Sequence, residues 1–574
     1  MRNLLILLLL QVPAFAFSQE FLNLGFEYKT KGQATPQKWR IANDGYEVSI
    51  DSVQKYQGSQ SLKIESLVDS KDKVGACATS FPVDFAKGKY LKLTGKIKTV
   101  AVQKGKAELW LRVDDEKDVL KPDKIHKRGV SGTQNWTKIS IEVKVDTNAI
   151  EINFGAMVSG EGTAWFDDFE LFVGEKKFFD LAPRLLEPTP QELTWLKKYI
   201  YPINTVDPDA PEHKDLAVLK KLTSRAQVVA FGEATHGSSE IFKLKHRMIR
   251  FLVENSNFNV FSIEANLPES YMVNQYVVNG KGNPRELIKR LYYWTWNTQE
   301  VLDMVEWMRI SNKTKQFQFT GFDMQFYDGA IHNLQVSFKK QREVVSTVSS
   351  LKQGLDYIAY YKQGSLESIA LIQQVEKVNS QLSAINRFIS TSDFDEQEKK
   401  WLLQNVRIIE QYIGNNQTSR DAYMAENFFW IRKQNAGSKF IIWAHNEHIK
   451  KSGFSMGKYL ANALGKEYLA VGFAFYKGDY TADGKNGLNT YTAQNADIGT
   501  YEYFFNAIKV PIFIIDLRAA RLDKSENGKW LQQKLGFRNV GSTKMDHEFV
   551  DATITEDFDL LVFIRESTSS RLID

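Results

Sequence analysis

Cysteine is almost missing from this chain of 574 residues, whose only thiol belongs to Cys77. A single cysteine cannot form an internal disulfide, so each domain has to be held together by its own core. The surroundings of Cys77, VGACATSFPV, read as a strand. We therefore interpret this thiol as a small buried hydrophobic group rather than as a nucleophile.

A strong charge of either sign is missing as well. Lys and Arg together number 74 against 69 for Asp and Glu, which leaves a net charge of +5. So small an excess over this length gives no argument for a nucleic-acid partner or for an anionic membrane surface. The hydrophobic fraction of 43% is ordinary for a globular protein, and the length predicts two or more domains.

Long apolar runs are missing except at the start of the chain. There, MRNLLILLLLQVPAFAFSQ places Arg2 before an apolar block at 4–10, followed by small residues and a polar exit. This layout predicts a secretory signal peptide at 1–18, cut near Ser18. The block is shorter than the ~20 residues that a spanning helix needs. We expect a periplasmic or secreted protein with no integral membrane segment after cleavage.

Residues 20–173 are expected to form an all-β domain. Short alternating stretches such as YLKLTGKIKTV and TKISIEVKV are separated by turn signals, with no long helical pattern between them. This rhythm predicts an antiparallel sandwich of jelly-roll type. The opening NLGFEY…PQKW and the closing EGTAWFDDFELFV resemble galactose-binding-like and carbohydrate-binding-module sandwiches, which implies a glycan partner. Trp39, Trp110 and Trp165 could stack on a sugar ring, although core packing is favoured for each.

A polar, proline-bearing linker at 174–195 precedes a domain at 196–574 in which strands and helices alternate. Its strands are apolar almost throughout, as in QVVAFG (227–232) and KFIIWAH (439–445), and helical patterns such as EIFKLKHRMIRFLVEN separate them. This alternation predicts an α/β domain whose mostly parallel sheet has helices on both faces. Residues 331–437 contain almost no strand signal and predict a helical insertion, either a cap over a site or an additional layer.

Titratable or polar residues follow four of the predicted strands directly. Because ligands of parallel sheets bind at the carboxyl ends of the strands, these positions mark a candidate site. They are Glu233, His236, Glu264, Asp323, Gln325, His445 and His448. Each has a structural interpretation when taken alone, such as helix capping by Glu233 or pairing of Glu264 with Arg247. Their recurrence at one edge of the sheet favours a functional cluster.

Activation of water is the chemistry that suits this cluster. A histidine such as His236 or His445 can accept a proton from water, and a nearby carboxylate fixes its tautomer and stabilises the imidazolium. The same side chains could hold a metal ion, since His445 and His448 lie about one helical turn apart. The HExxH pattern is absent, however, so the metal alternative is the weaker one.

One further motif has the residue pattern of a nucleophile site but lacks the structural context that such a site requires. Residues 453–457, GFSMG, have the G-x-S-x-G pattern of a nucleophile elbow, which requires a strand that runs directly into the first glycine. The preceding NEHIKKS is polar and breaks that context. We interpret Ser455 as part of a helix start.

From about residue 190 onward the chain resembles the erythromycin esterase family. The resemblance rests on GEATHGSSE, KHRMIRFLVE, FSIEA, YYWTWNTQEVLDMVEWMR, TGFDMQ, WAHNEHIKKSGFSMGKYL and GFAFYKGDY, in this order. Members of that family are α/β hydrolases that open the lactone of macrolide antibiotics without a serine nucleophile and generally without a metal.

The resemblance implies a role for each matching residue. His236 would activate water with Glu233 and Glu264 beside it, and the pair His445 and His448 would orient substrate or stabilise developing charge. Lys245 and Arg247 both match the family's basic residue in the first helix, and the sequence does not choose between them. Asp323 and Gln325 are expected to contact substrate. No cofactor is expected.

The sequence therefore predicts a hydrolase of carboxylic esters or lactones whose substrate is a small molecule, with or without attached sugars. Antibiotic resistance is the role that the resemblance suggests. Two alternatives stay open, namely a metal-dependent hydrolase or peptidase on the same side chains and a catalytically silent glycan-binding surface protein. No nucleic-acid partner is expected.

Overall fold

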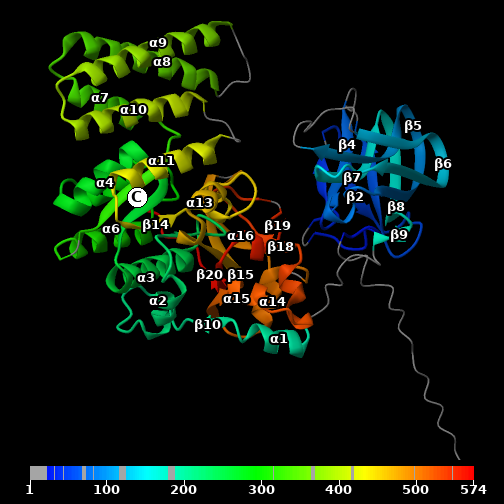
Figure 1. The fold of residues 1–574 in the computed structure, drawn as a ribbon. Coiled ribbons are helices and arrows are strands. Elements are labelled where there is room, and N and C mark those ends of the chain that lie inside the picture. The colour runs from blue at the N-terminus through cyan, green and yellow to red at the C-terminus, as the bar shows by residue number, and fades with distance from the viewer. Residues whose placement is uncertain are drawn as a thin grey trace, which may run out of the picture. The chain divides into compact units, whose positions relative to one another are not determined.

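The computed structural model divides into two compact units, Met1–Leu186 and Glu187–Asp574 (Figure 1). The expected signal peptide at 1–18 lies outside the residues that the structure describes. Those residues are 22–30, 33–42, 44–67, 73–81, 83–115, 125–178, 188–314, 316–362, 369–414, 419–485, 487–496, 498–545 and 547–573. No helix in these ranges combines the length and the hydropathy that crossing a membrane requires.

The first unit is built from antiparallel strands. The order in its sheet is β1-β4-β7-β5-β8-β3-β2, with β6 beside β5 and β9 beside β8. The long strand β5 joins two halves, because its first part pairs with β8 and its second part with β7. The strands are β1 (Arg40–Ala42), β2 (Tyr46–Asp51), β3 (Ser61–Ser66), β4 (Val74–Phe81), β5 (Tyr90–Asp115), β6 (Ile125–Lys144), β7 (Ala149–Ser159), β8 (Glu161–Val173) and β9 (Lys176–Lys177).

The core of this unit explains two of the expectations from sequence. Cys77 is fully buried in β4, and burial raises the pKa of its thiol well above the ordinary value, as befits a structural cysteine. Trp39 is also buried, with its ring centroid 4.9 Å from that of Phe26 and 5.6 Å from that of Phe154. An all-β domain is therefore confirmed, and its jelly-roll topology stays a prediction.

The second unit contains a mixed sheet of order β10-β17-β20-β15-β11-β14-β12-β13, with β16 beside β15. The run from β20 to β13 is parallel, whereas β17, β10 and β16 pair in the antiparallel sense. The strands are β10 (Ile200–Pro202), β11 (Val228–Phe231), β12 (Phe258–Asn266), β13 (Gln318–Asp323), β14 (Lys439–Trp443), β15 (Tyr468–Gly484), β16 (Gly487–Ala493), β17 (Ile512–Asp516) and β20 (Leu560–Ser567); β18 (Leu535–Arg538) and β19 (Phe549–Ala552) form a separate pair.

Helices connect these strands, and α3 (Ser239–Ser256) begins three residues after His236. Ser238 caps it by accepting a hydrogen bond from the backbone N–H of Ile241, and Asn257 ends it in the left-handed conformation. The other connecting helices are α1 (Pro190–Leu196), α2 (Ala217–Leu222), α4 (Leu267–Asn279), α5 (Pro284–Lys289), α6 (Gln299–Ser311), α12 (Asn446–Ile449), α13 (Met456–Leu464), α14 (Tyr501–Ala507), α15 (Leu517–Leu522) and α16 (Ile554–Asp557).

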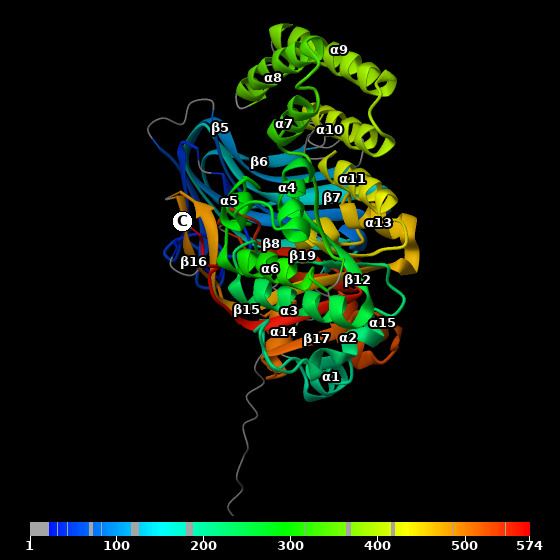
Figure 2. The same cartoon turned by 90° about the vertical axis from the view of Figure 1, so that its left-hand side faces the viewer.

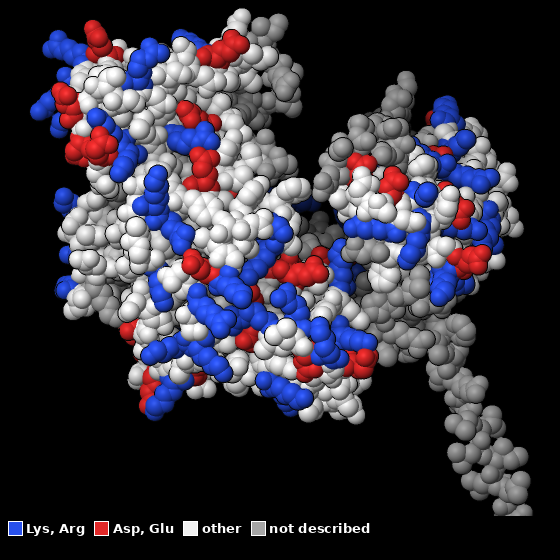
Figure 3. Space-filling model, in the orientation of Figure 1, with Lys and Arg blue, Asp and Glu red and all other residues white. Residues whose placement is uncertain are grey.

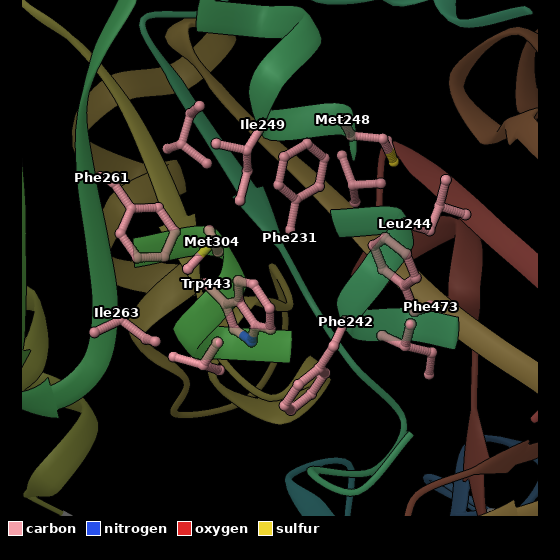
Figure 4. Packing of buried hydrophobic residues seen from close by; sticks show 14 of the residues in the cluster. Phe231, Phe242, Leu244, Met248, Ile249, Phe261, Ile263, Met304, Trp443 and Phe473 are labelled. Atoms are coloured by element: carbon pink, nitrogen blue, oxygen red, sulfur yellow. The ribbon is translucent and has the colours of Figure 1, made fainter. Parts of the chain in front are cut away.

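The central strands are apolar because they are buried. All four residues of β11 are buried, so no alternation of polar and apolar side chains is needed. In Figure 4, Phe231 and Phe473 of the strands lie beside Leu244 and Met248 of α3, and Trp443 at the end of β14 lies near Phe242. A mixed sheet with helices is confirmed for this unit, and coverage of both faces stays a prediction.

The segment expected to be a helical insertion contains α7 (Asp328–Ser337), α8 (Arg342–Lys362), α9 (Ile369–Thr391), α10 (Glu396–Gly414) and α11 (Arg420–Gln434). Helices α8 and α9 stand away from the sheet in both ribbon views (Figures 1 and 2). Helix α11, in contrast, packs against β13 and α13. The insertion therefore reaches the sheet through α11.

Charge is mixed on the molecular surface. On the face drawn in Figure 3, side chains of both signs are present over the second unit, and Lys and Arg predominate in its lower part. This agrees with the small net charge of +5.

Candidate active site

The carboxyl ends of four neighbouring parallel strands bring the predicted residues together. In the sheet these strands lie in the order β11-β14-β12-β13, which differs from their order in the chain. Phe231 of β11 pairs with Trp443 of β14, and Trp443 pairs in turn with Ile263 of β12. The residues that follow these three positions must therefore share one edge of the sheet.

Glu233 is the centre of the first half of the site. Its buried carboxylate places Oε1 2.6 Å from Nδ1 of His236, while Oε2 accepts hydrogen bonds from Nζ of Lys245 at 2.5 Å and from Nε1 of Trp443 at 2.7 Å. Because a carboxylate is an acceptor, Nδ1 of His236 carries the proton in the neutral ring. Nε2 of His236 is then the proton acceptor.

Lys245 and Arg247 lie on different faces of α3. They are two residues apart, and in an α-helix this spacing rotates the side chain by about 200° around the helix axis. Lys245 is fully buried with its ammonium 4.3 Å from the ring centroid of Trp443. Burial lowers the pKa of Lys245 to about 8, and the charge of Glu233 acts in the opposite direction. Arg247 lies outside the cluster, in a bidentate pair with Asp215. Of the two basic candidates, the structure brings only Lys245 to the site.

Glu264 is the centre of the second half of the site. Its Oε1 accepts a hydrogen bond from Nη2 of Arg420 at 2.8 Å, and its Oε2 accepts one from the backbone N–H of His445 at 2.9 Å. Burial alone would raise the pKa of Glu264, but the charges of His448 and Arg420 hold it well below its ordinary value. Glu264 is therefore an anion that organises the residues around it.

Arg420, at the start of α11, connects the insertion to the site. Besides Glu264 it contacts the buried carboxylate of Asp323, with Nη2 2.7 Å from Oδ2. Gln325 also donates to Oδ2 of Asp323, at 2.8 Å. Asp323 and Gln325, which were predicted to contact substrate, thus both lie at the end of β13 beside the site. The carboxylate of Asp323, however, is hydrogen-bonded to Arg420 and Gln325.

His448 lies between two carboxylates. Its Nδ1 is 2.9 Å from Oδ1 of Asp421, and its Nε2 is 3.2 Å from Oε1 of Glu264. Burial lowers the pKa of His448, but Glu264 and Asp421 outweigh burial and raise it to about 10, with Arg420 acting against them. His448 is therefore an imidazolium at neutral pH.

This protonation predicts a dependence of stability on pH. Folding raises the pKa of His448 from the ~6.5 of an unfolded chain, so proton binding stabilises the fold fully below about pH 6.5 and this contribution is lost as pH rises toward about 10. We expect the free energy of unfolding of the wild type to exceed that of His448→Gln most at the acidic end. Urea unfolding of both proteins across this range measures the difference, and a difference that grows toward alkaline pH would contradict the assignment.

His445 faces the first histidine. Its ring centroid lies 5.1 Å from that of His236, and its Nδ1 accepts a weak hydrogen bond, at 3.3 Å, from the backbone N–H of Glu447. Burial and the neighbouring charges of His236 and His448 hold the pKa of His445 well below its ordinary value, so the ring is neutral. The proton then resides on Nε2, which is buried and has no hydrogen-bond partner among the described residues.

Ser455 serves the start of α13. Its Oγ accepts from the backbone N–H of Lys458 and donates to the backbone carbonyl of Lys450 at 2.5 Å. No strand leads into it, because the strand before it, β14, ends at Trp443. The hydroxyl is a helix cap, as the sequence indicates.

Several residues of the site were missed by the sequence analysis. Arg420 and Asp421 come from the insertion, and Trp443 was given no role of its own. Trp296 donates from its indole to the backbone carbonyl of Glu264 at 3.0 Å and places its ring 5.9 Å from that of His236. Trp296 and Trp443 both stand in stretches on which the family resemblance rests, YYWTWNTQEVLDMVEWMR and WAHNEHIKKSGFSMGKYL.

The carboxylates of the cluster are already engaged by N–H donors on both oxygens, as for Glu233 and Glu264. In the part of the chain that the structure describes, no three His, Cys, Asp or Glu side chains are arranged to hold a metal ion. The arrangement instead offers one histidine as a proton acceptor, one neutral histidine as a donor and a frame of fixed charges around them.

Comparison with known proteins shows which family the second unit resembles. Residues 253–567, more than half of the chain, match the family model for erythromycin esterase. The matched span contains the second half of the site, whereas Glu233 and His236 precede it. The erythromycin esterase type II of Escherichia coli is 25% identical over 332 residues, which are 50% of this chain and 78% of that protein.

Two solved structures are similar to different parts of the chain. A succinoglycan biosynthesis protein is 26% identical, covers 68% of this chain and 100% of its own, and superposes with a TM-score of 0.59. A xylan-binding domain from Paenibacillus barcinonensis is 18% identical and covers 26% of this chain and 90% of its own, with a TM-score of 0.20.

Proposed function

We propose that this chain, which belongs to the erythromycin esterase family, hydrolyses carboxylic ester or lactone bonds by direct attack of an activated water molecule. The family supports a hydrolase, and the observation that carries the finer proposal is the hydrogen bond of 2.6 Å between Glu233 and His236. It fixes Nε2 of His236 as the acceptor for a proton from water.

The reaction follows from the protonation states of the two histidines. Nε2 of His236 takes a proton from water while the water oxygen forms a bond to the carbonyl carbon, and the carbonyl oxygen becomes an oxyanion. The Nε2–H of neutral His445 donates a hydrogen bond to that oxyanion. The imidazolium of His236 then returns the proton to the leaving alcohol oxygen as the C–O bond breaks. Ester and water give acid and alcohol, and the enzyme is restored.

The surrounding charges favour this proton transfer. The cluster holds three cations against the four carboxylates Glu233, Glu264, Asp323 and Asp421; the cations are Lys245, Arg420 and His448. With all of these ionised, the cluster is one charge negative before His236 takes the proton and neutral afterwards. In a buried site of low dielectric constant, that balance stabilises the imidazolium.

Incubation of the purified chain with erythromycin and with 4-nitrophenyl esters, with and without EDTA, tests the proposal by mass spectrometry. We expect addition of one water to the substrate at a rate that EDTA does not change. Loss of activity with EDTA would favour a metal-dependent hydrolase, and no activity on either substrate would favour a binding protein. Cleavage of erythromycin would make macrolide resistance the proposed role, and cleavage of aryl esters alone would direct the search to glycan esters.

We also propose that the first unit binds a glycan, on the face that carries Trp110. The indole of Trp110 is partly exposed, and its N–H has no hydrogen-bond partner among the described residues. It lies opposite Gly155, beside Arg112, so small and polar groups border the ring as in a sugar site. Trp39 is buried in the core, and Trp165 donates its indole N–H to Asp51 at 2.7 Å, which leaves Trp110 as the candidate.

Affinity electrophoresis in gels that contain soluble polysaccharides tests the glycan site. We expect Trp110→Ala to lose the retardation that the wild type shows, with Trp136→Ala, on β6, as the matched control. Equal retardation of the two variants would contradict a site at Trp110.

An exported protein would meet such a glycan outside the cytoplasm. Detection of the mature chain in the periplasmic or culture fraction tests the proposed export.

A further inference from the structure

The segment 291–298, LYYWTWNT, lies beside the site and contacts it through Trp296. It connects α5 to α6, and Thr298 ends it by capping α6. Trp296 ties it to the second strand of the site, because its indole donates to the backbone carbonyl of Glu264 at 3.0 Å. The ring of Trp296 also lies 5.9 Å from that of His236. The segment is therefore fixed directly beside the proton acceptor.

The backbone of this segment adopts an unusual conformation at Tyr292. Its φ of +67° lies in the left-handed region, which bulky side chains rarely occupy. The ring of Tyr292 is 45% exposed and stacks on Phe326 at 4.5 Å, whereas Tyr293 approaches the same phenylalanine at 5.3 Å. Two consecutive tyrosines thus contact one ring, but only the hydroxyl of the second is buried.

Phe326 places these tyrosines at the edge of the sheet where the site lies. It follows β13 by three residues, and its backbone exchanges two hydrogen bonds with the side chain of Asn266 at the end of β12, at 2.7 and 3.2 Å. Tyr293 therefore lies at the carboxyl ends of β12 and β13, the strands that supply Glu264 and Asp323.

The hydroxyl of Tyr293 is buried and has no hydrogen-bond partner among the described residues. Buried polar groups without partners are destabilising, and each calls for an explanation, of which a catalytic role is one. Burial first, and then the charges of Asp323 and Glu264, raise the pKa of Tyr293, while Arg420 lowers it. The phenol stays protonated, so it is a hydrogen-bond donor.

We propose that Tyr293 is a further catalytic residue, whose O–H donates a hydrogen bond to the carbonyl oxygen of the ester as that oxygen becomes an oxyanion. The proposal rests on the ester hydrolysis proposed above. Nε2 of His445 and Oη of Tyr293 are both buried polar atoms without a partner in the described residues, and both belong to side chains next to the same cluster. Two fixed donors around one developing charge form an oxyanion hole.

The variant Tyr293→Phe removes only the hydroxyl. We expect kcat on a 4-nitrophenyl ester to fall by about 10²- to 10³-fold, with KM nearly unchanged, as for loss of one oxyanion donor. The melting temperature is expected to stay equal or rise, because a buried hydroxyl without a partner is removed. Tyr292→Phe is the matched control. The side chain of Tyr292 is exposed and its hydroxyl has no part in the proposal, so this variant should leave kcat unchanged.

A second measurement does not depend on turnover. A phosphonate that mimics the tetrahedral intermediate should bind Tyr293→Phe about 10²-fold more weakly than the wild type in calorimetry. Wild-type kcat or wild-type phosphonate affinity in Tyr293→Phe would overturn the proposal, and so would a loss of activity that accompanies a large drop in melting temperature. An inactive wild type would instead overturn the proposed function.

Discussion

Replacing His236 with alanine is expected to lower kcat for ester hydrolysis by about 10³- to 10⁴-fold while the protein stays folded. The imidazole is the only group in the described site whose acceptor nitrogen is set by a carboxylate, through the contact of 2.6 Å to Glu233. Its side chain is 11% exposed, so water can reach it, and Glu233 keeps Lys245 and Trp443 as hydrogen-bond partners when the imidazole is removed. Steady-state kinetics on a 4-nitrophenyl ester, with circular dichroism for the fold, measure both effects.

Two further variants serve as comparisons for His236→Ala. His332→Ala removes an exposed histidine on α7 and should keep wild-type kinetics. Glu233→Gln keeps the shape of the side chain but removes the charge that stabilises the imidazolium, so an intermediate loss is expected. A folded His236→Ala protein with wild-type kcat would show that another group activates the nucleophile.

Replacing Arg420 with alanine is expected to damage both activity and stability. The guanidinium forms ion pairs with two buried carboxylates, Glu264 at 2.8 Å and Asp323 at 2.7 Å. Removing one partner of a buried ion pair leaves uncompensated charge and costs about 3–5 kcal/mol. We expect urea unfolding to report a loss of this size. Since Glu264 also holds the backbone of His445, kcat should fall by about 10²-fold or more.

Arg407 provides a matched control from the neighbouring helix α10. It pairs with Glu426 and Glu410 but its side chain is 39% exposed, so Arg407→Ala should cost less than about 1 kcal/mol and leave kcat unchanged. If Arg420→Ala behaved like Arg407→Ala, the insertion would be an additional layer of the fold and no part of the site.

The strand-end residues could be predicted from the sequence because a general rule applied to them. Apolar strands are easy to recognise, and the carboxyl ends of parallel strands meet at one edge. Glu233, His236, Glu264 and His445 followed from those two facts. The choice between Lys245 and Arg247 did not, because both are charged residues on one helix and only the packing of α3 shows which of them faces Glu233.

Arg420 and Asp421 could not be predicted in the same way. They lie about 155 residues after Glu264 in the chain, at the start of a helix whose pattern shows no functional signal. Their place depends on how α11 packs against β13, which local periodicity does not encode. The same holds for the antiparallel pairing of β17 and β10 at one edge of the sheet, since an apolar strand reads alike in either direction.

The origin of the oxygen in the product acid shows whether water or a side chain attacks the ester. A single turnover with enzyme in excess over the ester, in ¹⁸O-labelled water, is followed by mass spectrometry of both the acid and the enzyme. We expect one ¹⁸O in the acid from the first turnover and an enzyme of unchanged mass. An unlabelled acid with label in a carboxylate of the enzyme, or an acyl group trapped on the enzyme, would contradict it.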